Sequence, residues 1–234
     1  MNASMTPVAR GIRRAALVLL VLAALPAVGC GSSSTEEPSG TTNAGPGLQT
    51  SQPPWRPEYA HLAQRIRALG LPPAGTERFH IHALLRIYVD GLLSPLPPNI
   101  GIDHARDIES SLHTHDATGV IHMEATHPHR FTLGDFFSVW GVKLGPAQVG
   151  GLSGLGGDRL HFFLNGRPLR DPAAHQLRDD DNVVIGYGAL DSFPHAPSTE
   201  LLRALKSRDG TALSCSVTPG RRTRRCFAPK RGGR

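Results

Sequence analysis

The sequence predicts an α+β domain in which a mixed sheet packs on one helix, and three segments support this. Residues 78–91 alternate polar and apolar side chains with the period of a strand. Residues 131–142 hold an apolar segment between Thr132, a good helix N-cap, and Gly141, a residue type that ends helices. Residues 182–188 form a late apolar strand. We expect a disordered N-terminal tether before this domain and a basic C-terminal tail after it.

Residues 1–29 are predicted to be a bacterial lipoprotein signal peptide. Three arginines precede an apolar run at 15–28 that is short for a membrane span. The run ends in Ala-Val-Gly directly before Cys30, which resembles a lipoprotein cleavage box. This resemblance implies that Cys30 is lipidated. The mature chain is then extracytoplasmic, anchored to the bacterial cell membrane in the periplasm or at the cell surface. A plain secreted protein is the alternative.

Charge and composition separate the ends of the chain from its middle. Residues 30–54 are rich in Gly, Ser, Thr and Pro and predict a flexible linker. Residues 201–234 hold ten Lys or Arg and one acidic residue, whereas residues 30–200 hold twelve basic and eighteen acidic residues. The basic pI of the chain therefore comes from its ends, and we expect no specific nucleic acid partner.

The predicted domains follow from these boundaries. A histidine-rich domain spans residues 55–195, and residues 196–234 form a short helix and the basic tail. The tail holds Cys215 and Cys226, which we expect to form one disulfide in an oxidising compartment; two free thiols are the alternative.

The elements of the domain follow in order. Apolar residues at helical spacing predict a helix over 57–69, which Gly70 and two prolines end. Strands are predicted over 78–91, 110–125 (a hairpin), 159–169 (with an Asn-Gly turn) and 182–188. Helices are predicted over 131–142 and over 197–207.

Residues 131–188 resemble the second half of β-grasp, ubiquitin-like domains, a group that includes the small sulfur-carrier proteins. In both, a helix leads to a strand that ends in Asn-Gly, and a Leu…Asp-x-Asp turn precedes the last strand. The resemblance implies a β-grasp-like mixed sheet packed on one helix and speaks to fold alone. A sulfur carrier needs a free C-terminal Gly-Gly, but here Arg234 follows Gly232-Gly233. We therefore do not expect a sulfur-carrier activity.

Histidines are concentrated in the first strand and in the hairpin, and they share faces. His80 and His82 lie two residues apart, so they occupy one face of a strand whose other face is apolar. A hairpin closed at residues 116–119 places His113 opposite His122 and His115 opposite Val120. The faces that carry histidine are thus separated from the faces that carry apolar side chains.

If the apolar faces build one core, the histidines converge on the other side of the sheet. Imidazole nitrogens and a carboxylate are the donors that a divalent transition metal requires, most readily zinc or copper. The predicted ligands are His80, His82, His113, His115, His122 and Glu124. Asp116 is a further candidate, as a ligand or as an acceptor of a ring N–H. Two alternatives remain open: a titrating polar surface without metal, and a buried histidine network with a structural or pH-sensing role.

Other residues and motifs carry weaker hypotheses. His127 and His129 are candidate auxiliary ligands, and His161 could face the same side; His61, His104, His175 and His195 are expected at the surface. The carboxylate spacing that a cupin needs after its His-x-His pair does not occur, and the glycine-rich stretch 151–157 lacks the Lys-Ser/Thr of a P-loop.

The segments HIHALLRIYVDG, HTHDATGVIHME and FTLGDFFSVWG together resemble a group of uncharacterised secreted bacterial lipoproteins, a likeness that carries over no activity. We therefore expect an extracytoplasmic, lipid-anchored protein that binds, buffers or delivers a transition metal. Its partners are then the membrane, through the lipid anchor, and a protein partner. A metal-dependent hydrolase or oxidase is the first alternative, and a metal-free adhesion or assembly module is the second.

Overall fold

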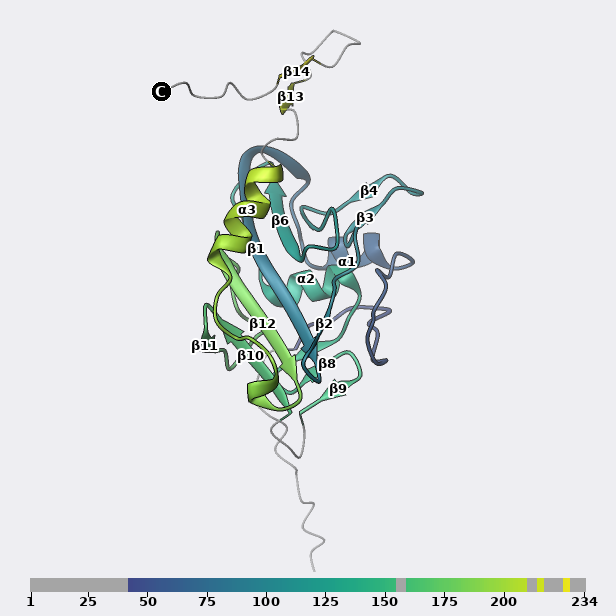
Figure 1. Ribbon diagram of the computed structural model, residues 1–234. Coiled ribbons are helices and arrows are strands. Elements are labelled where there is room, and N and C mark those ends of the chain that lie inside the picture. The colour runs from purple at the N-terminus through teal and green to yellow at the C-terminus, as the bar shows by residue number, and fades with distance from the viewer. Residues whose placement is uncertain (1–41, 155–158, 210–213, 217–224, 228–234) are drawn as a thin grey trace, which may run out of the picture. The chain divides into compact units, whose positions relative to one another are not determined.

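The centre of the protein is a seven-stranded mixed sheet (Figure 1). The computed structural model describes residues 42–154, 159–209, 214–216 and 225–227. Six strands follow the order β11-β10-β12-β1-β6-β5, and β2 pairs with β1 beside this path. Their bounds are Ala74–Val89 (β1), Leu92–Ser94 (β2), Leu112–His113 (β5), Val120–Ala125 (β6), Leu160–Leu164 (β10), Arg167–Pro168 (β11) and Asp181–Tyr187 (β12).

The directions of these strands confirm the predicted mixed sheet. β1 runs parallel to β12 and antiparallel to β2 and β6, and β10 is antiparallel to β12. Over the described residues the sheet is open rather than closed into a barrel. Asn165 and Gly166 both have positive φ in the turn between β10 and β11, as the predicted Asn-Gly hairpin requires.

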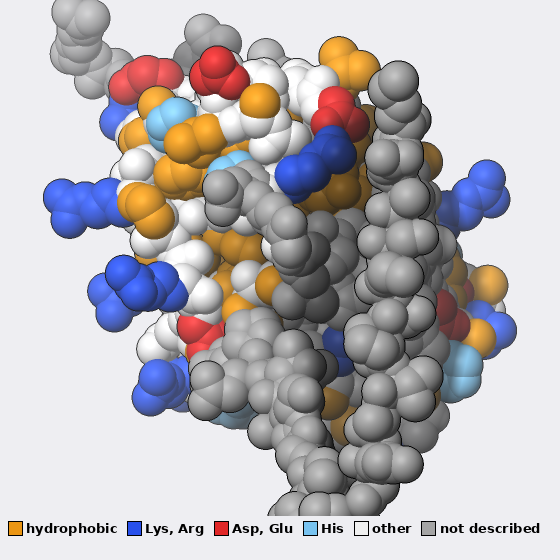
Figure 2. Space-filling model, turned by 90° about the horizontal axis from the view of Figure 1, so that it is seen from below, with side chains coloured by type: hydrophobic (Ala, Val, Ile, Leu, Met, Phe, Trp, Pro, Cys, Tyr) orange, Lys and Arg blue, Asp and Glu red, His pale blue; other side chains and the backbone are white. Residues whose placement is uncertain are grey.

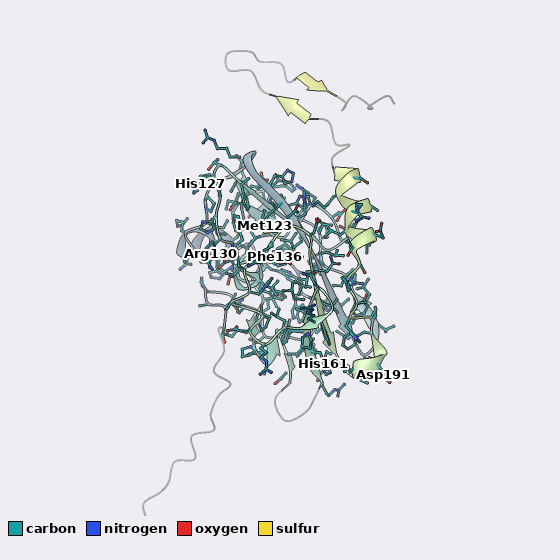
Figure 3. The ribbon with its side chains drawn as sticks, turned by 90° about the vertical axis from the view of Figure 1, so that its left-hand side faces the viewer. Met123, His127, Arg130, Phe136, His161 and Asp191 are labelled. Carbon is teal, nitrogen blue, oxygen red and sulfur yellow. The ribbon has the colours of Figure 1, made fainter. Side chains whose placement is uncertain are left out.

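The main core lies on one face of this sheet, under helix α2 (Leu133–Trp140). The odd-numbered apolar residues of β1 point to this face, as do Ile121 and Met123 of β6, and all of them pack with the aromatic residues of α2. Figure 3 shows Met123 and Phe136 close together inside the domain. The alternation of β1 therefore predicted the correct faces.

Helix α2 begins and ends where the sequence predicts. The Thr132 side chain accepts a hydrogen bond from Asp135 N, while the Asp135 carboxylate accepts one from Thr132 N, which makes a capping box. Gly141 ends the helix in the left-handed conformation, with φ of 80°. These local signals fix the helix at both ends and aim its apolar side at the sheet.

The second face of the sheet is partly covered, which corrects the expectation of a sheet packed on one helix. Helix α3 (Thr199–Asp209) places Leu202 and Leu205 against Leu84 of β1 and Val120 of β6, and these four residues form a separate buried cluster. Figures 1 and 3 show α3 on the side of the sheet away from α2. α3 therefore belongs to the folded domain instead of lying outside it at residues 196–234.

The predicted flexible linker at 30–54 is also corrected, over the part that the structure describes. Asn43 is buried, and its side-chain amide donates to Val142 O and accepts from Leu144 N. Gln49 forms a bridge with Val142. The Asn43 amide thus satisfies backbone hydrogen-bonding groups in the segment that follows α2. The composition of residues 30–54 did not predict these contacts. Residues 1–41, with the predicted signal peptide and Cys30, lie outside the described residues.

Helix α1 (Leu62–Ala68) is shorter than the predicted helix 57–69, and Glu58 lies before its first turn. The Glu58 carboxylate accepts from His61 N and pairs with the guanidinium of Arg65, which is fully buried. Arg65 also donates to the carbonyl groups of Pro46 and Val139. One buried cation therefore ties the N-terminal segment and α1 to the end of α2.

Short elements complete the fold. They are β3 (Ile102–Asp103), β4 (Ile108–Glu109), β7 (Leu144–Gly145), β8 (Gln148–Val149), β9 (Leu152–Ser153) and the 3-10 helix η1 (Leu190–Ser192). In the tail, β13 (Ser214–Ser216) and β14 (Arg225–Phe227) pair with Cys215 opposite Cys226. The disulfide between these cysteines stays a prediction.

The described surface is mixed in character. Figure 2 shows Lys and Arg side chains spread around the rim of one face, with hydrophobic side chains exposed between them. In the part of the chain that the structure describes, no helix has both the length and the hydropathy that crossing a membrane requires.

Candidate metal centre

The three strands β1, β6 and β5 carry five of the six predicted metal ligands on one face, and the sixth, His115, follows two residues after the end of β5. In the ladder between β1 and β6, His82 is the partner of His122 and His80 is the partner of Glu124. In the ladder between β5 and β6, His113 is the partner of His122. The hairpin register predicted for His113 and His122 is therefore confirmed, and β1 lies directly beside β6. We call the six residues His80, His82, His113, His115, His122 and Glu124 the histidine cluster.

The histidine cluster contains two groups whose ligand atoms come close enough to hold a metal ion. One group is His113, His115, His122 and Glu124, and the other is His80, His82 and His122. Within each group the ligand atoms all lie within 4.8 Å of one another. Every ligand predicted from the sequence thus belongs to at least one group, and His122 belongs to both.

Direct contacts inside the histidine cluster are short. His113 Nε2 lies 3.2 Å from His115 Nε2, and Glu124 Oε1 lies 2.9 Å from His80 Nε2 and 3.3 Å from His122 Nδ1. The ring of His122 lies between the two histidine pairs, with its centroid 4.7 Å from that of His82 and 4.3 Å from that of His115. Donor atoms at these spacings can surround a metal ion that is bound at distances of about 2.0–2.2 Å.

Burial keeps the imidazoles of His82 and His113 neutral. His82, His113 and His122 are 8%, 0% and 3% exposed, whereas His80 and His115 reach solvent. Burial lowers the pKa of His113 to about 4, and His115 and His122 beside it act in the same direction. Burial lowers the pKa of His82 to about 4 as well, with further lowering from His122 and His80. At neutral pH both rings therefore offer a lone pair.

Glu124 supplies negative charge to the same site. Burial alone raises its pKa, but the hydrogen bond with His122 and the positive potential of His113 and His80 outweigh burial and lower the pKa to about 2. The carboxylate is therefore ionised at neutral pH. Neutral imidazoles beside an ionised carboxylate are the protonation states in which these residues bind a divalent cation.

Two further contacts hold the His113 ring and the His82 backbone in place, and the sequence predicted neither of them. His113 Nδ1 lies 2.9 Å from Ser110 O, and a carbonyl can only accept, so the proton sits on Nδ1 and the lone pair on Nε2. Such a bond fixes the tautomer of a metal-binding histidine. The Asp179 carboxylate accepts from His82 N at 3.0 Å and from the Lys206 ammonium of α3 at 2.8 Å. No local motif marked Ser110 or Asp179.

His82 Nε2 is buried without a hydrogen-bond partner among the described residues. A buried ring nitrogen without a partner is costly in a folded protein, which makes it a sign of a ligand. The sequence predicted His82 as a ligand but could not predict that its Nε2 would be left without a protein partner.

Other predicted residues lie elsewhere. Asp116 is exposed and accepts from Thr118 N and from the Thr118 hydroxyl, so it stabilises the hairpin turn, and no described contact joins it to an imidazole. His127 is exposed and contacts Thr126, and His161 contacts Gly188 O. Figure 3 shows His127 and His161 at opposite ends of the domain. His129 packs on Phe131.

His175 corrects the expectation of a surface residue. Its side chain is 15% exposed, and its Nε2 lies 2.9 Å from Asp181 Oδ2. Asp181 also accepts from Arg178 N and from the Asn165 side chain. His175 therefore belongs to a buried network beside the Asn165 turn and takes no part in the histidine cluster.

A small pocket opens beside the exposed end of the histidine cluster. Its volume is about 220 Å³, and His115, Glu109 and Asp107 are among its lining residues. Glu109 Oε1 lies 4.0 Å from His113 Nε2. His115 of the first group therefore borders a pocket whose size suits water or a small molecule.

Comparison of the chain with protein-family models, with curated proteins and with solved structures finds no match. The functional argument therefore depends on the residues of the site.

Proposed function

We propose that this protein binds a transition metal ion through the histidine cluster on the outer face of its sheet. The observation that carries the proposal is the convergence of three imidazoles and one carboxylate, from His113, His115, His122 and Glu124, with ligand atoms within 4.8 Å. The neutral state of His113 and the ionised state of Glu124 support it.

The donor chemistry favours zinc or copper(II). Imidazole nitrogen with carboxylate oxygen suits both ions, and three histidines with a carboxylate make a four-coordinate set. Met123, the methionine of β6, is fully buried in the main core on the opposite face. A thioether-rich copper(I) site is therefore not favoured.

The proposed role is to bind, buffer or deliver the metal outside the cytoplasm. The support is the N-terminal sequence, in which arginines, an apolar run and Cys30 resemble a lipoprotein signal. A lipid on Cys30 is then the membrane partner, and delivery requires a protein partner. The acidic balance of residues 30–200 supports the expectation of no specific nucleic acid.

We also propose that the sheet and α2 form a β-grasp-like domain. Support comes from α2 being followed, after the short strands β7 to β9, by β10, which ends at the Asn165-Gly166 turn, and from β12 lying parallel to β1 at the centre of the sheet. This proposal concerns the fold and adds no activity.

A metal-dependent hydrolase or oxidase is the second candidate function. The observation that favours it is the pocket beside His115, in which the carboxylate of Glu109 could accept a proton from a metal-bound water. Turnover of a small polar substrate by the metal-loaded protein, lost in Glu109→Gln with metal binding retained, is the result that this candidate requires.

The test of metal binding uses the full chain without an affinity tag. We expect elemental analysis and zinc titration to show bound metal, and His122→Ala to abolish tight binding because His122 serves both groups. His195→Ala, which removes an exposed histidine stacked on Phe163, should bind as the wild type does. Circular dichroism checks the fold of each variant.

Metal-free protein that does not bind added zinc or copper at micromolar concentration contradicts the proposal. The histidines would then belong to a metal-free adhesion or assembly module. If His122→Ala does not fold, His115→Ala is the second test: His115 is exposed and belongs to the four-ligand group, so its loss should weaken metal binding at that group.

A further inference from the structure

We infer that the histidine cluster holds two metal ions at adjacent positions, with His122 shared between them. This inference rests on the proposed metal-binding function. It follows from the division of the ligands into two groups that have one member in common.

One ion does not account for all the donors. Tetrahedral coordination is complete with the four residues of the first group, His113, His115, His122 and Glu124. His80 and His82 are then left over, although their ring centroids lie only 4.5 Å apart. Their group closes through His122, whose ring is 4.7 Å from that of His82.

The buried nitrogen of His82 points to the second position independently. His82 is 8% exposed, and its Nε2 has no hydrogen-bond partner among the described residues. An ion bound by His80, His82 and His122 would give this nitrogen a partner. His80 reaches solvent, which gives that ion a path of entry.

The ring of His122 has the donors that sharing requires, because imidazole has two nitrogens on different edges, and the neutral ring carries one proton and one lone pair. With both positions filled, His122 would use one nitrogen for each ion, which requires the ring to give up its proton to solvent. Glu124 Oε1, 2.9 Å from His80 Nε2, places negative charge beside both positions.

Zinc stoichiometry of the full chain tests the inference with two matched variants. We expect two equivalents in the wild type, one in His80→Ala and one in His115→Ala, because each variant removes a ligand from a different group. Both side chains are exposed, so neither change opens a cavity in the core. His195→Ala should keep two equivalents.

Copper(II) provides the test of the bridge. Two copper(II) ions joined by an imidazolate couple magnetically, so the integrated electron paramagnetic resonance intensity at low temperature should fall well below the bound copper. In His80→Ala the remaining copper should give full intensity.

The outcomes separate this inference from the proposed function. One equivalent in the wild type, unchanged in His80→Ala, overturns the second position and leaves metal binding intact. Two equivalents of copper with full signal intensity overturn the sharing of His122. Zero equivalents overturn both proposals.

Discussion

Burial divides the imidazoles of the histidine cluster into inner and outer residues. His82, His113 and His122 are buried, and burial lowers the pKa of His82 and His113 to about 4. His80 and His115 are exposed and close the two groups from the solvent side. His82 and His113 therefore offer neutral rings from inside the histidine cluster, while His80 and His115 give an ion access from solvent.

The Asp181 network offers a residue-scale test away from the histidine cluster. Burial raises the pKa of Asp181, but hydrogen bonds from His175, Arg178 and Asn165 outweigh it and bring the pKa below its ordinary value of 3.8. Since the folded-state pKa is the lower one, this carboxylate stabilises the fold fully above pH 3.8, and the contribution is lost as the pH falls through the lowered pKa.

Asp181→Asn should lower the free energy of unfolding by about 1–3 kcal/mol at pH 7, because buried donors lose their charged acceptor. Urea unfolding measures this, and the difference from wild type should shrink as the pH falls below 3.8 and through the lowered pKa. Asp191→Asn on η1, an exposed position, is the control. A difference that stays constant from pH 7 to pH 2.5 contradicts the assigned charge.

At the scale of elements, α3 and the histidines share the outer face of the sheet. Leu202 and Leu205 cover Leu84 and Val120. Leu84 lies two residues after His82, and Val120 lies two residues before His122, so all four side chains share one face of the sheet. Lys206 then reaches Asp179, whose carboxylate holds the backbone of His82. α3 thus borders the histidine cluster and fixes one of its strands.

Leu202→Ala should destabilise the protein by about 2–5 kcal/mol, since a fully buried leucine is replaced by a cavity. Its neighbour Leu201 is 45% exposed, so Leu201→Ala should change stability by no more than about 0.5 kcal/mol. Denaturant unfolding of the two variants gives the comparison. Equal effects of both substitutions would show that α3 does not pack on the sheet in solution.

Sequence patterns predicted the elements well because their signals are local. Hairpin loops of two and of four residues give the same register, which placed His113 opposite His122. Thr132 and Gly141 marked the two ends of α2. The assumption of one core placed His80 and His82 on the same side of the sheet as the hairpin histidines, but it did not predict that β1 pairs with β6, since no local signal selects a neighbouring strand. The packing of α3 on Leu84 and the contacts of Asn43 could not be predicted, because in both cases the partners are far apart in sequence.

At the scale of the whole molecule, metal binding should appear as added stability. A ligand that binds only the folded state at 100 times its Kd adds about 2.7 kcal/mol, which corresponds to a rise in Tm of roughly 5–10 °C for a domain of this size. Thermal unfolding with zinc, reversed by a chelator, measures it. The same rise in His122→Ala would place the bound ion outside the histidine cluster.

The ladder between β1 and β6 also has a consequence for how quickly an ion comes and goes. Its backbone hydrogen bonds hold His82 opposite His122 and His80 opposite Glu124, and these bonds involve no side-chain donor. An ion therefore enters a frame that is already built, in contrast to small zinc domains that fold only around their metal. Exchange is then governed by ligand substitution at the exposed rings of His80 and His115, so release to an acceptor requires no unfolding of the sheet.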